Sequence, residues 1–281
     1  KAKSDGKGTF HTFSVDDKTK DELETRVFWK HQIETALKDN NFVLNYQPIL
    51  DIKTNIITHY EVLIRMRDSQ TGEIRMPGKF IEIAEQVGLI HSIDHYVLQQ
   101  GMIKLSMLKK QGVEAKFAIN LSGSVVDDPI LLPMLKQLMK KHHINPDDLI
   151  FEITETAAVS NLQQAKEMMI AVRQLGCRFA LDDFGVGFSS FNYMRELPID
   201  IIKIDGIFIK DLDKNAADQL FVKALVDVAK GLGHKTIAEF VENREILDLL
   251  RDYGVDYGQG YYIGKPDGSI RETEHWQHAE S

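Results

Sequence analysis

Short apolar runs alternate with amphipathic segments over most of this 281-residue sequence. The runs are rich in Val, Ile, Phe and Tyr, as expected of buried strands. Eight strand candidates cover residues 42–50, 59–66, 116–122, 149–155, 178–184, 200–207, 235–241 and 257–264. Segments with helical periodicity join six of them, at residues 77–90, 130–143, 162–176, 218–233 and 244–254. Such an alternation indicates a mainly parallel sheet covered by helices on both faces.

Eight strand–helix units close naturally into a TIM-like (β/α)8 barrel. One connection departs from this pattern, because only residues 51–58 (DIKTNIIT) join the first two strands. That length is too short for a helical crossover and suits a hairpin. We therefore predict an α/β fold, a (β/α)8 TIM-like barrel with an antiparallel first strand. An open doubly wound sheet is the alternative, but no GxGxxG motif opens a helix to support it.

The two ends of the sequence fall outside the alternating pattern. Residues 1–15 are rich in Lys and Gly and finish in a strand-like stretch, so we expect them to be the tail of an upstream domain. Residues 16–40 are predicted to form a charged linker helix, and the barrel is predicted over residues 41–268. Residues 269–281 remain as a C-terminal tail. The less solvent-exposed face of the linker helix is expected to carry Leu23, Val27, Trp29, Ile33 and Leu37.

Composition narrows the class of protein. The formal net charge of −8 argues against a general binder of nucleic-acid polymers or of membrane surfaces. Cys177 is the single cysteine, so no internal disulfide can form. Such a low cysteine content is typical of proteins in a reducing compartment. No apolar run is long enough to span a membrane. We expect a cytoplasmic fragment without membrane contact, whose full-length protein could be anchored upstream.

Polar residues interrupt the apolar strands at matching points. Each lies well along its strand, so each is expected to reach the same mouth of the barrel, where barrel enzymes hold their sites. A lone acid in a strand is usually solvated or paired, but a set repeated over consecutive strands indicates a common site. The residues are Glu61, Asn120, Glu152, Asp182, Asp183, Lys203, Glu239 and Gln259.

Carboxylates that converge in this way repel one another and are costly to desolvate. Lys203 and Arg65 are too few to neutralise them, so the pattern predicts bound cations. Oxygen ligands suit Mg²⁺, Mn²⁺ or Ca²⁺ better than zinc. The adjacent Asp182 and Asp183 could serve two ions about 3.5–4 Å apart. Because the strand ends there, Asp183 is free of the alternation of faces and can join Asp182.

A two-ion site of this kind stabilises the in-line attack of water on a phosphodiester. Lys203 would hold that water or the charge that develops on phosphorus. A proton-abstracting barrel of the enolase type, using Glu152, Asp182 and Lys203, is an alternative. Enzymes of that type normally carry a large capping domain, for which residues 1–40 are too few.

Eight stretches, in order, resemble the EAL-type cyclic diguanylate phosphodiesterases. They are YQPI (46–49), EVLIR (61–65), INLS (119–122), FEITET (151–156), LDDFGVGFSSF (181–191), IKID (202–205), AEFVE (238–242) and QGYYIGKP (259–266). The resemblance covers residues 28–267. It implies a (β/α)8-like barrel with a reversed first strand, which uses two Mg²⁺ or Mn²⁺ ions to cleave cyclic diguanylate to linear pGpG. Ca²⁺ is expected to inhibit.

The resemblance also implies individual roles. Metal ligands would be Glu61, Asn120, Glu152, Asp182, Asp183 and Glu239, and Asp182 would bridge the two ions. Catalytic residues would be Lys203, which holds the attacking water, together with Glu239, Glu61 and Gln259. Substrate would contact Gln47, Leu63 and Arg65, and Glu155 would anchor the DDFG loop. That loop contributes to the family's dimer interface, so a homodimer is expected.

Three positions depart from the family's common pattern without removing a charged catalytic group. Val62 interrupts the usual EAL triplet, Val186 replaces a threonine in the DDFG loop, and Phe240 stands where glycine is common. These changes leave open a second function, a cyclic diguanylate receptor that binds without cleaving. Residues 1–14 are similar to the end of GGDEF (diguanylate cyclase) domains, which implies the C-terminal part of a GGDEF–EAL protein.

Overall fold

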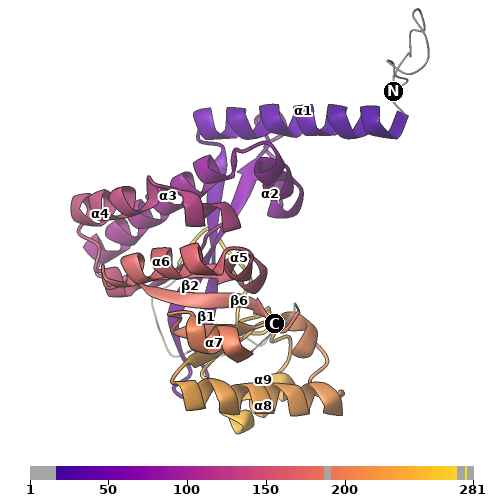
Figure 1. The fold of residues 1–281 in the computed structure, drawn as a ribbon, viewed down its shortest axis with the longest axis vertical. Coiled ribbons are helices and arrows are strands. Elements are labelled where there is room, and N and C mark those ends of the chain that lie inside the picture. Colours follow the sequence, from indigo (N-terminus) through magenta and orange to yellow (C-terminus); the bar gives the residue numbers. More distant parts are fainter. Residues whose placement is uncertain (1–16, 187–190, 271–275, 277–281) are drawn as a thin grey trace, which may run out of the picture.

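A closed ring of eight strands forms the centre of the computed structural model, which describes residues 17–186, 191–270 and 276 (Figure 1). Around the ring the order is β1, β9, β8, β7, β6, β5, β4 and β2, and β1 pairs with β2 to close it. The short strand β3 adds to the far edge of β2. The strands are β1 (Phe42–Asp51), β2 (Ile56–Arg67), β3 (Ile74–Arg75), β4 (Phe117–Asn120), β5 (Leu149–Thr154), β6 (Arg178–Phe184), β7 (Ile201–Ile204), β8 (Lys235–Ala238) and β9 (Tyr257–Gly258).

Helices surround this ring and bury their apolar faces against the outside of the sheet (Figure 1). None of the helices in the described part of the chain combines the length and the apolar character that a membrane span requires. The α-helices are α1 (Asp17–Lys38), α2 (Pro77–Gln86), α3 (Ile90–Lys110), α4 (Leu131–His142), α5 (Glu155–Ser160), α6 (Leu162–Arg173), α7 (Phe191–Glu196), α8 (Ala216–Leu232) and α9 (Arg244–Tyr253).

The reversed first strand is confirmed. β1 runs antiparallel to both of its neighbours, β2 and β9, whereas the pairs from β2 through β4 to β9 are all parallel. A turn at residues 52–55 joins β1 to β2, and Asn55 has the positive φ of 55° that such a tight turn favours. The alternative of an open doubly wound sheet is wrong, because the β1–β2 ladder leaves the ring without open edges.

The sequence did not indicate helices α3, α5 and α7 or the short strand β3, and it predicted too long a last strand. Helix α3 follows α2 after a short turn and buries Ile93, Leu98 and Met102, although the strand–helix alternation requires only one helix here. The last predicted strand, residues 257–264, is limited to β9. The chain turns away because Gly260 lies against the backbone of Val241, where a side chain would overlap the carbonyl oxygen at 2.2 Å.

Helix α1 falls within the predicted linker segment. Of the apolar face that was predicted to be the less exposed one, only the C-terminal half is shielded from solvent. Ile33 is fully buried, whereas the side chains of Leu23 and Val27 are 57% and 61% exposed. The N-terminal half of α1 projects past α2 in Figure 1, so no described element covers it. The proposed tail of an upstream GGDEF-like domain, residues 1–15, lies outside the described residues.

The inside of the barrel has its own small apolar layer, separate from the core between sheet and helices. Six strands contribute one side chain each, and the ring of Tyr257 packs against them. His59 completes the layer from β2, with its ring edge-on to Tyr257 at 5.2 Å between centroids. The six residues are Ile49, Ala118, Ile150, Ala180, Ile201 and Ile237.

Burial in this layer lowers the pKa of His59 to about 3, and the positive charges of Arg178, Lys203 and Lys116 add to the effect. In the unfolded chain His59 is therefore protonated below about pH 6.5, whereas in the folded chain it stays neutral down to about pH 3. The contribution of neutral His59 to the unfolding free energy is therefore fully present above about pH 6.5 and is lost as the pH falls toward 3. We expect His59 to account for about 2 kcal/mol of lost unfolding free energy at pH 5.

Urea unfolding at pH 7 and pH 5 tests this expectation, with His59→Asn as the comparison. The amide can keep the contact that Thr58 Oγ1 makes with His59 Nδ1 at 2.8 Å, but it does not titrate. All other ionisable groups are common to the two proteins, so the variant should lose about 2 kcal/mol less than the wild type. An identical loss in both proteins would contradict the assignment.

Candidate active site

A ring of polar side chains lies directly above the apolar layer, inside the barrel mouth. Residues i and i+2 of a strand share a face, and each polar residue lies two positions beyond a member of the apolar layer, toward the carboxyl ends of the parallel strands. In the antiparallel β1 the step runs backwards, from Ile49 to Gln47. One residue comes from each strand or its end: Gln47, Glu61, Asn120, Glu152, Asp182, Lys203, Glu239 and Gln259. The structure thus brings together the residues expected to converge, and Gln47, predicted only to contact substrate, joins them.

Lys203 lies at the centre of the ring and is fully buried. Its Nζ is 2.9 Å from Glu152 Oε2, 3.0 Å from Glu239 Oε1 and 3.1 Å from Asp182 Oδ1. Glu61 Oε2 is further away, at 3.8 Å. One ammonium therefore faces four carboxylates, and the cluster carries a formal excess of negative charge.

Amide side chains hold Glu61 in place. Asn120 Nδ2 donates to Glu61 Oε1 at 2.6 Å, and Gln259 Nε2 donates to Glu61 Oε2 at 2.5 Å. Gln259 Nε2 also lies 3.1 Å from Gln47 Oε1, and Gln47 Nε2 donates to the carbonyl of Gly264 at 3.2 Å. Both carboxylate oxygens of Glu61 thus accept a hydrogen bond, which fixes the orientation of the group.

A bulge places Asp182 and Asp183 side by side. Leu181 pairs with Ile202 and Phe184 pairs with Ile204, so two residues of β6 oppose the single residue Lys203 of β7. Asp183 adopts a φ of 55°, outside the strand region, and its backbone N–H donates to Asp182 Oδ1 at 3.0 Å. The release of Asp183 from the alternation of faces is therefore found, but through a bulge inside β6 rather than through the end of the strand.

Burial and charge move the pKa values of the cluster in opposite directions. Burial raises the pKa of Glu152 well above its usual value, and it raises the pKa of Glu239 to about 7, in both cases against the pull of Lys203. Burial also raises the pKa of Asp183 to about 6. For Lys203, burial is outweighed by the surrounding carboxylates, so its pKa is raised and it stays charged. Glu61 is buried too, but Lys203 and the two amides lower its pKa.

The cluster has the composition of a divalent-cation site. One carboxylate oxygen from each of Asp182, Asp183 and Glu239 lies within 4.8 Å of the others. Glu152 Oε1 and Gln259 Oε1 are buried and have no hydrogen-bond partner. Unpartnered buried oxygens next to excess negative charge fit a cation, and a donor set made only of oxygen suits a hard divalent cation such as Mg²⁺, Mn²⁺ or Ca²⁺. The residues present therefore fit the metal ions that the sequence predicted.

A pocket of about 290 Å³ opens beside the cluster. The three predicted substrate residues, Gln47, Leu63 and Arg65, all line it together with Glu61, Glu239 and Gln259. Arg65 is buried, and its Nη1 donates to the carbonyl of Ile64 at 2.8 Å, which leaves other guanidinium donors for an anion. The pocket is thus lined both by the positively charged Arg65 and by carboxylates of the acidic cluster.

Five further residues line this pocket, and the sequence did not indicate a place there for any of them: Phe240, Glu242, Gly260, Tyr261 and Pro266. The sequence marks Phe240 only as a residue that stands where glycine is common. Tyr261 fell within a predicted strand, whereas it follows the turn at Gly260. A positive φ at a bulky residue, as at Phe240, has no signal in a single sequence.

Glu155 is buried at the first residue of α5. The loop that it is predicted to anchor includes residues 187–190, which lie outside the described residues, so its role stays a prediction. The homodimer expected through the same loop is likewise untested. Val186, just before that segment, is exposed.

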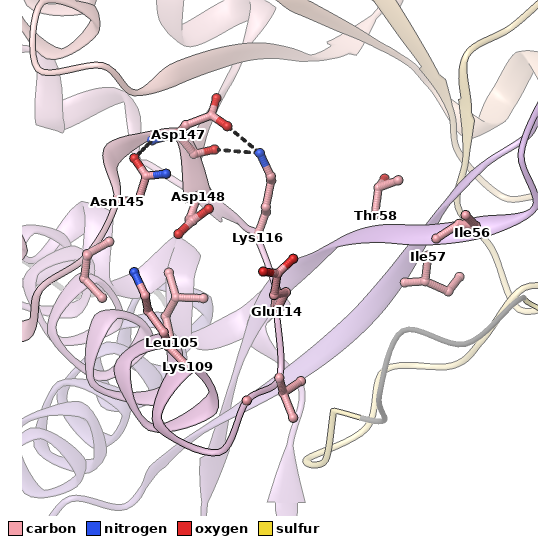
Figure 2. A pocket seen from close by; sticks show the side chains of 14 residues that line it. Ile56, Ile57, Thr58, Leu105, Lys109, Glu114, Lys116, Asn145, Asp147 and Asp148 are labelled. Atoms are coloured by element: carbon pink, nitrogen blue, oxygen red, sulfur yellow. Dashed lines mark hydrogen bonds and ion pairs between the residues drawn. The ribbon is translucent and has the colours of Figure 1, made fainter.

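A larger pocket, of about 610 Å³, lies at the opposite end of the barrel, where β4 and β5 begin (Figure 2). Figure 2 shows Lys116 reaching Asp147, and its Nζ is 2.5 Å from Asp147 Oδ2. Asp148 and Glu114 lie nearby in the same view. The charges are mixed and partly paired with one another, and barrel enzymes keep stabilising contacts at this end. We therefore place the candidate active site at the carboxyl end.

The geometry agrees with a comparison to known protein families. The sequence profile described as "EAL domain" matches residues 30–266, most of the chain. The chain belongs to the EAL domain family. Among characterised relatives, this EAL domain is 38% identical over 266 residues to the cyclic di-GMP phosphodiesterase PdeB of Shewanella oneidensis. The match covers 94% of this chain and 31% of that protein, so the chain spans about a third of the relative's length.

Solved structures of EAL domains share the fold. The FimX EAL domain from Pseudomonas aeruginosa bound to c-di-GMP superposes with a TM-score of 0.81 at 31% identity, covering 87% of this chain and 98% of that one. The PaMucR phosphodiesterase in complex with c-di-GMP gives a TM-score of 0.80 at 29% identity, covering 85% and 97%. The TIM-like barrel is therefore the fold of this EAL domain.

Proposed function

We propose that this EAL domain is a metal-dependent phosphodiesterase that hydrolyses cyclic diguanylate to linear pGpG. The observation that carries the proposal is the ring of four carboxylates and three amides around the buried Lys203, beside a pocket that contains Arg65. Such a cluster tolerates a phosphodiester anion only when cations offset its negative charge. The relatives named above as phosphodiesterases support the substrate.

Metal ligation would be divided between two groups of residues that share Asp182. Glu61, Asn120, Glu152 and Asp182 would hold one ion, and Asp182, Asp183 and Glu239 the second. When bound, two Mg²⁺ or Mn²⁺ ions neutralise charge and stabilise both the attacking and the leaving oxygen of an in-line displacement. Ca²⁺, which is larger and less strict in geometry, is proposed to bind without supporting turnover.

The chain's own side chains perform the positioning. Lys203 stays protonated, so it would donate a hydrogen bond to the attacking water or to a phosphate oxygen. Glu239 would act either as the general base that accepts the proton of that water or as a ligand of the second ion. Gln259 and Asn120 hold Glu61 rigid, and Arg65 would clamp a phosphate through charge-assisted hydrogen bonds.

Incubation with cyclic diguanylate tests the proposal directly. We expect pGpG to form in excess Mg²⁺ and to disappear when excess EDTA removes the metal. Chromatography of the nucleotide products is the measurement, and restoration by added Mn²⁺ is the control. Intact nucleotide that binds but is never cleaved would contradict the enzyme and support the receptor function instead.

A further inference from the structure

Phe240 has a backbone conformation that an aromatic residue rarely adopts. Its φ is 53°, in the left-handed region, where a bulky side chain is a genuine outlier. Hydrogen bonds on both sides fix the segment, since Glu239 N donates to Ile204 O at 3.3 Å and Val241 N donates to Gln259 O at 2.9 Å. Backbone strain of this kind persists where the surroundings impose it, and it is concentrated at ligand-binding sites.

The ring of Phe240 is not placed there by burial. Phe240 is 55% exposed, although Ala238 and Val241 on either side of it in the chain are fully buried. Part of the ring lies against Gly206, where an added Cβ would come within 2.1 Å of Phe240 Cδ2. Only a glycine at position 206 permits this contact. The strained backbone therefore holds one edge of the Phe240 ring against the backbone of Gly206. The remainder of the ring stays accessible to solvent.

The accessible ring lines the same pocket as Arg65 and Glu239. Tyr261 is a second exposed aromatic residue there, but Lys265 Nζ lies 5.5 Å from the centroid of its ring and occupies one face. A positively charged side chain that binds phosphate, next to an aromatic ring that stacks on a base, is the usual composition of a site for unpaired nucleotides. Bases stack on such rings irrespective of their hydrogen-bonding edges.

We propose that Phe240 is a substrate-binding residue whose ring stacks on one guanine base of cyclic diguanylate. This inference rests on the proposed function and adds a residue outside the acidic cluster. Base stacking on one aromatic side chain contributes a factor of roughly 5 to 150 in affinity. The ring lies beside the cluster and not in it, so its removal weakens substrate binding and leaves the chemical step largely intact.

Steady-state kinetics of Phe240→Leu with cyclic diguanylate and Mg²⁺ tests the proposal. We expect KM to rise by roughly 5- to 150-fold, with a much smaller change in kcat. Phe240→Trp should retain a low KM. The matched control is Phe28→Leu, which removes another exposed ring, on α1 and not among the residues that line the pocket, and should leave both constants unchanged. Equal KM values for the wild type and Phe240→Leu would overturn the assignment.

Two further measurements separate stacking from a structural role. With Ca²⁺ replacing Mg²⁺, the guanine H8 resonance should move upfield on binding to the wild type and lose that ring-current shift with Phe240→Leu. Phe240→Gly relieves the positive φ, so its melting temperature should not fall below that of the wild type. A large fall, without a change in KM, would show that the ring only stabilises the fold.

Gly206→Ala gives an independent test, because the added methyl group displaces the ring. We expect it to raise KM in the wild type and to have little effect in the Phe240→Gly background. Equal effects in both backgrounds would contradict the contact. A wild type that neither binds nor cleaves cyclic diguanylate would refute the proposed function itself, whereas an active wild type with unaffected Phe240 variants would refute only this inference.

Discussion

Lys203→Met should destabilise the metal-free protein by about 3–5 kcal/mol, because it leaves several buried carboxylates without their cation. Glu152 is fully buried and Lys203 Nζ is its hydrogen-bond partner at 2.9 Å. Methionine fills a similar volume but supplies no charge, so the carboxylates must repel one another or take up protons. Thermal unfolding in EDTA is the measurement, and a fall of roughly 10 °C in Tm is expected.

Lys235→Met is the matched control. Lys235 lies on the same barrel and pairs with one carboxylate, with its Nζ 2.6 Å from Asp256 Oδ1, but its side chain is 60% exposed. Exposed pairs of this kind contribute about 0–1 kcal/mol. Added Mg²⁺ should raise the Tm of Lys203→Met more than that of the wild type, because the ion would offset the uncompensated carboxylates. Equal stability of the two lysine variants would contradict the central role of Lys203.

Glu61→Gln is expected to lower turnover by roughly 10²–10⁴-fold, the contribution typical of a positioned catalytic group. The amide is close to the carboxylate in shape, but it has no negative charge for a cation. An NH2 group also replaces one of the two carboxylate oxygens, so a donor would face either Asn120 Nδ2 or Gln259 Nε2, to both of which Glu61 accepts. The measurement is the rate of pGpG formation at saturating Mg²⁺.

Glu114→Gln provides the control for this loss. It makes the same chemical change at the opposite end of the barrel, where Glu114 lines the pocket of Figure 2, and it should keep wild-type turnover. Unchanged Tm values for both variants would show that the loss at position 61 is functional. A Glu61→Gln protein as active as the Glu114→Gln protein would contradict the site.

Much of the candidate site follows from a regularity that the sequence displays. Within strands that are otherwise apolar, a carboxylate or amide lies two positions beyond a small or apolar residue, as in Ala118 and Asn120 or Ile150 and Glu152. Side chains alternate along a strand, so this spacing places the polar groups above an apolar layer on the inner face. The barrel and its reversed first strand follow equally from strand order and connection length.

Other features depend on tertiary contacts that no local pattern contains. The apolar residues of α1 look alike in sequence, yet only its C-terminal half meets the barrel, which leaves Leu23 and Val27 exposed. The bulge at Asp183 depends on the register between β6 and β7. The strained Phe240 depends on the hydrogen bonds that hold its neighbours and on Gly206 beneath its ring.

The reversal of β1 decides at which end of the molecule the preceding helix is attached. Phe42, the first residue of β1, pairs with Met66 near the carboxyl end of β2, so α1 joins the barrel on the side of the mouth (Figure 1). A first strand parallel to the others would attach it at the opposite end. Five residues after Phe42, the same strand carries Gln47, which contacts Gln259. Half of one strand therefore separates the end of β1 nearest α1 from the polar ring of the candidate active site.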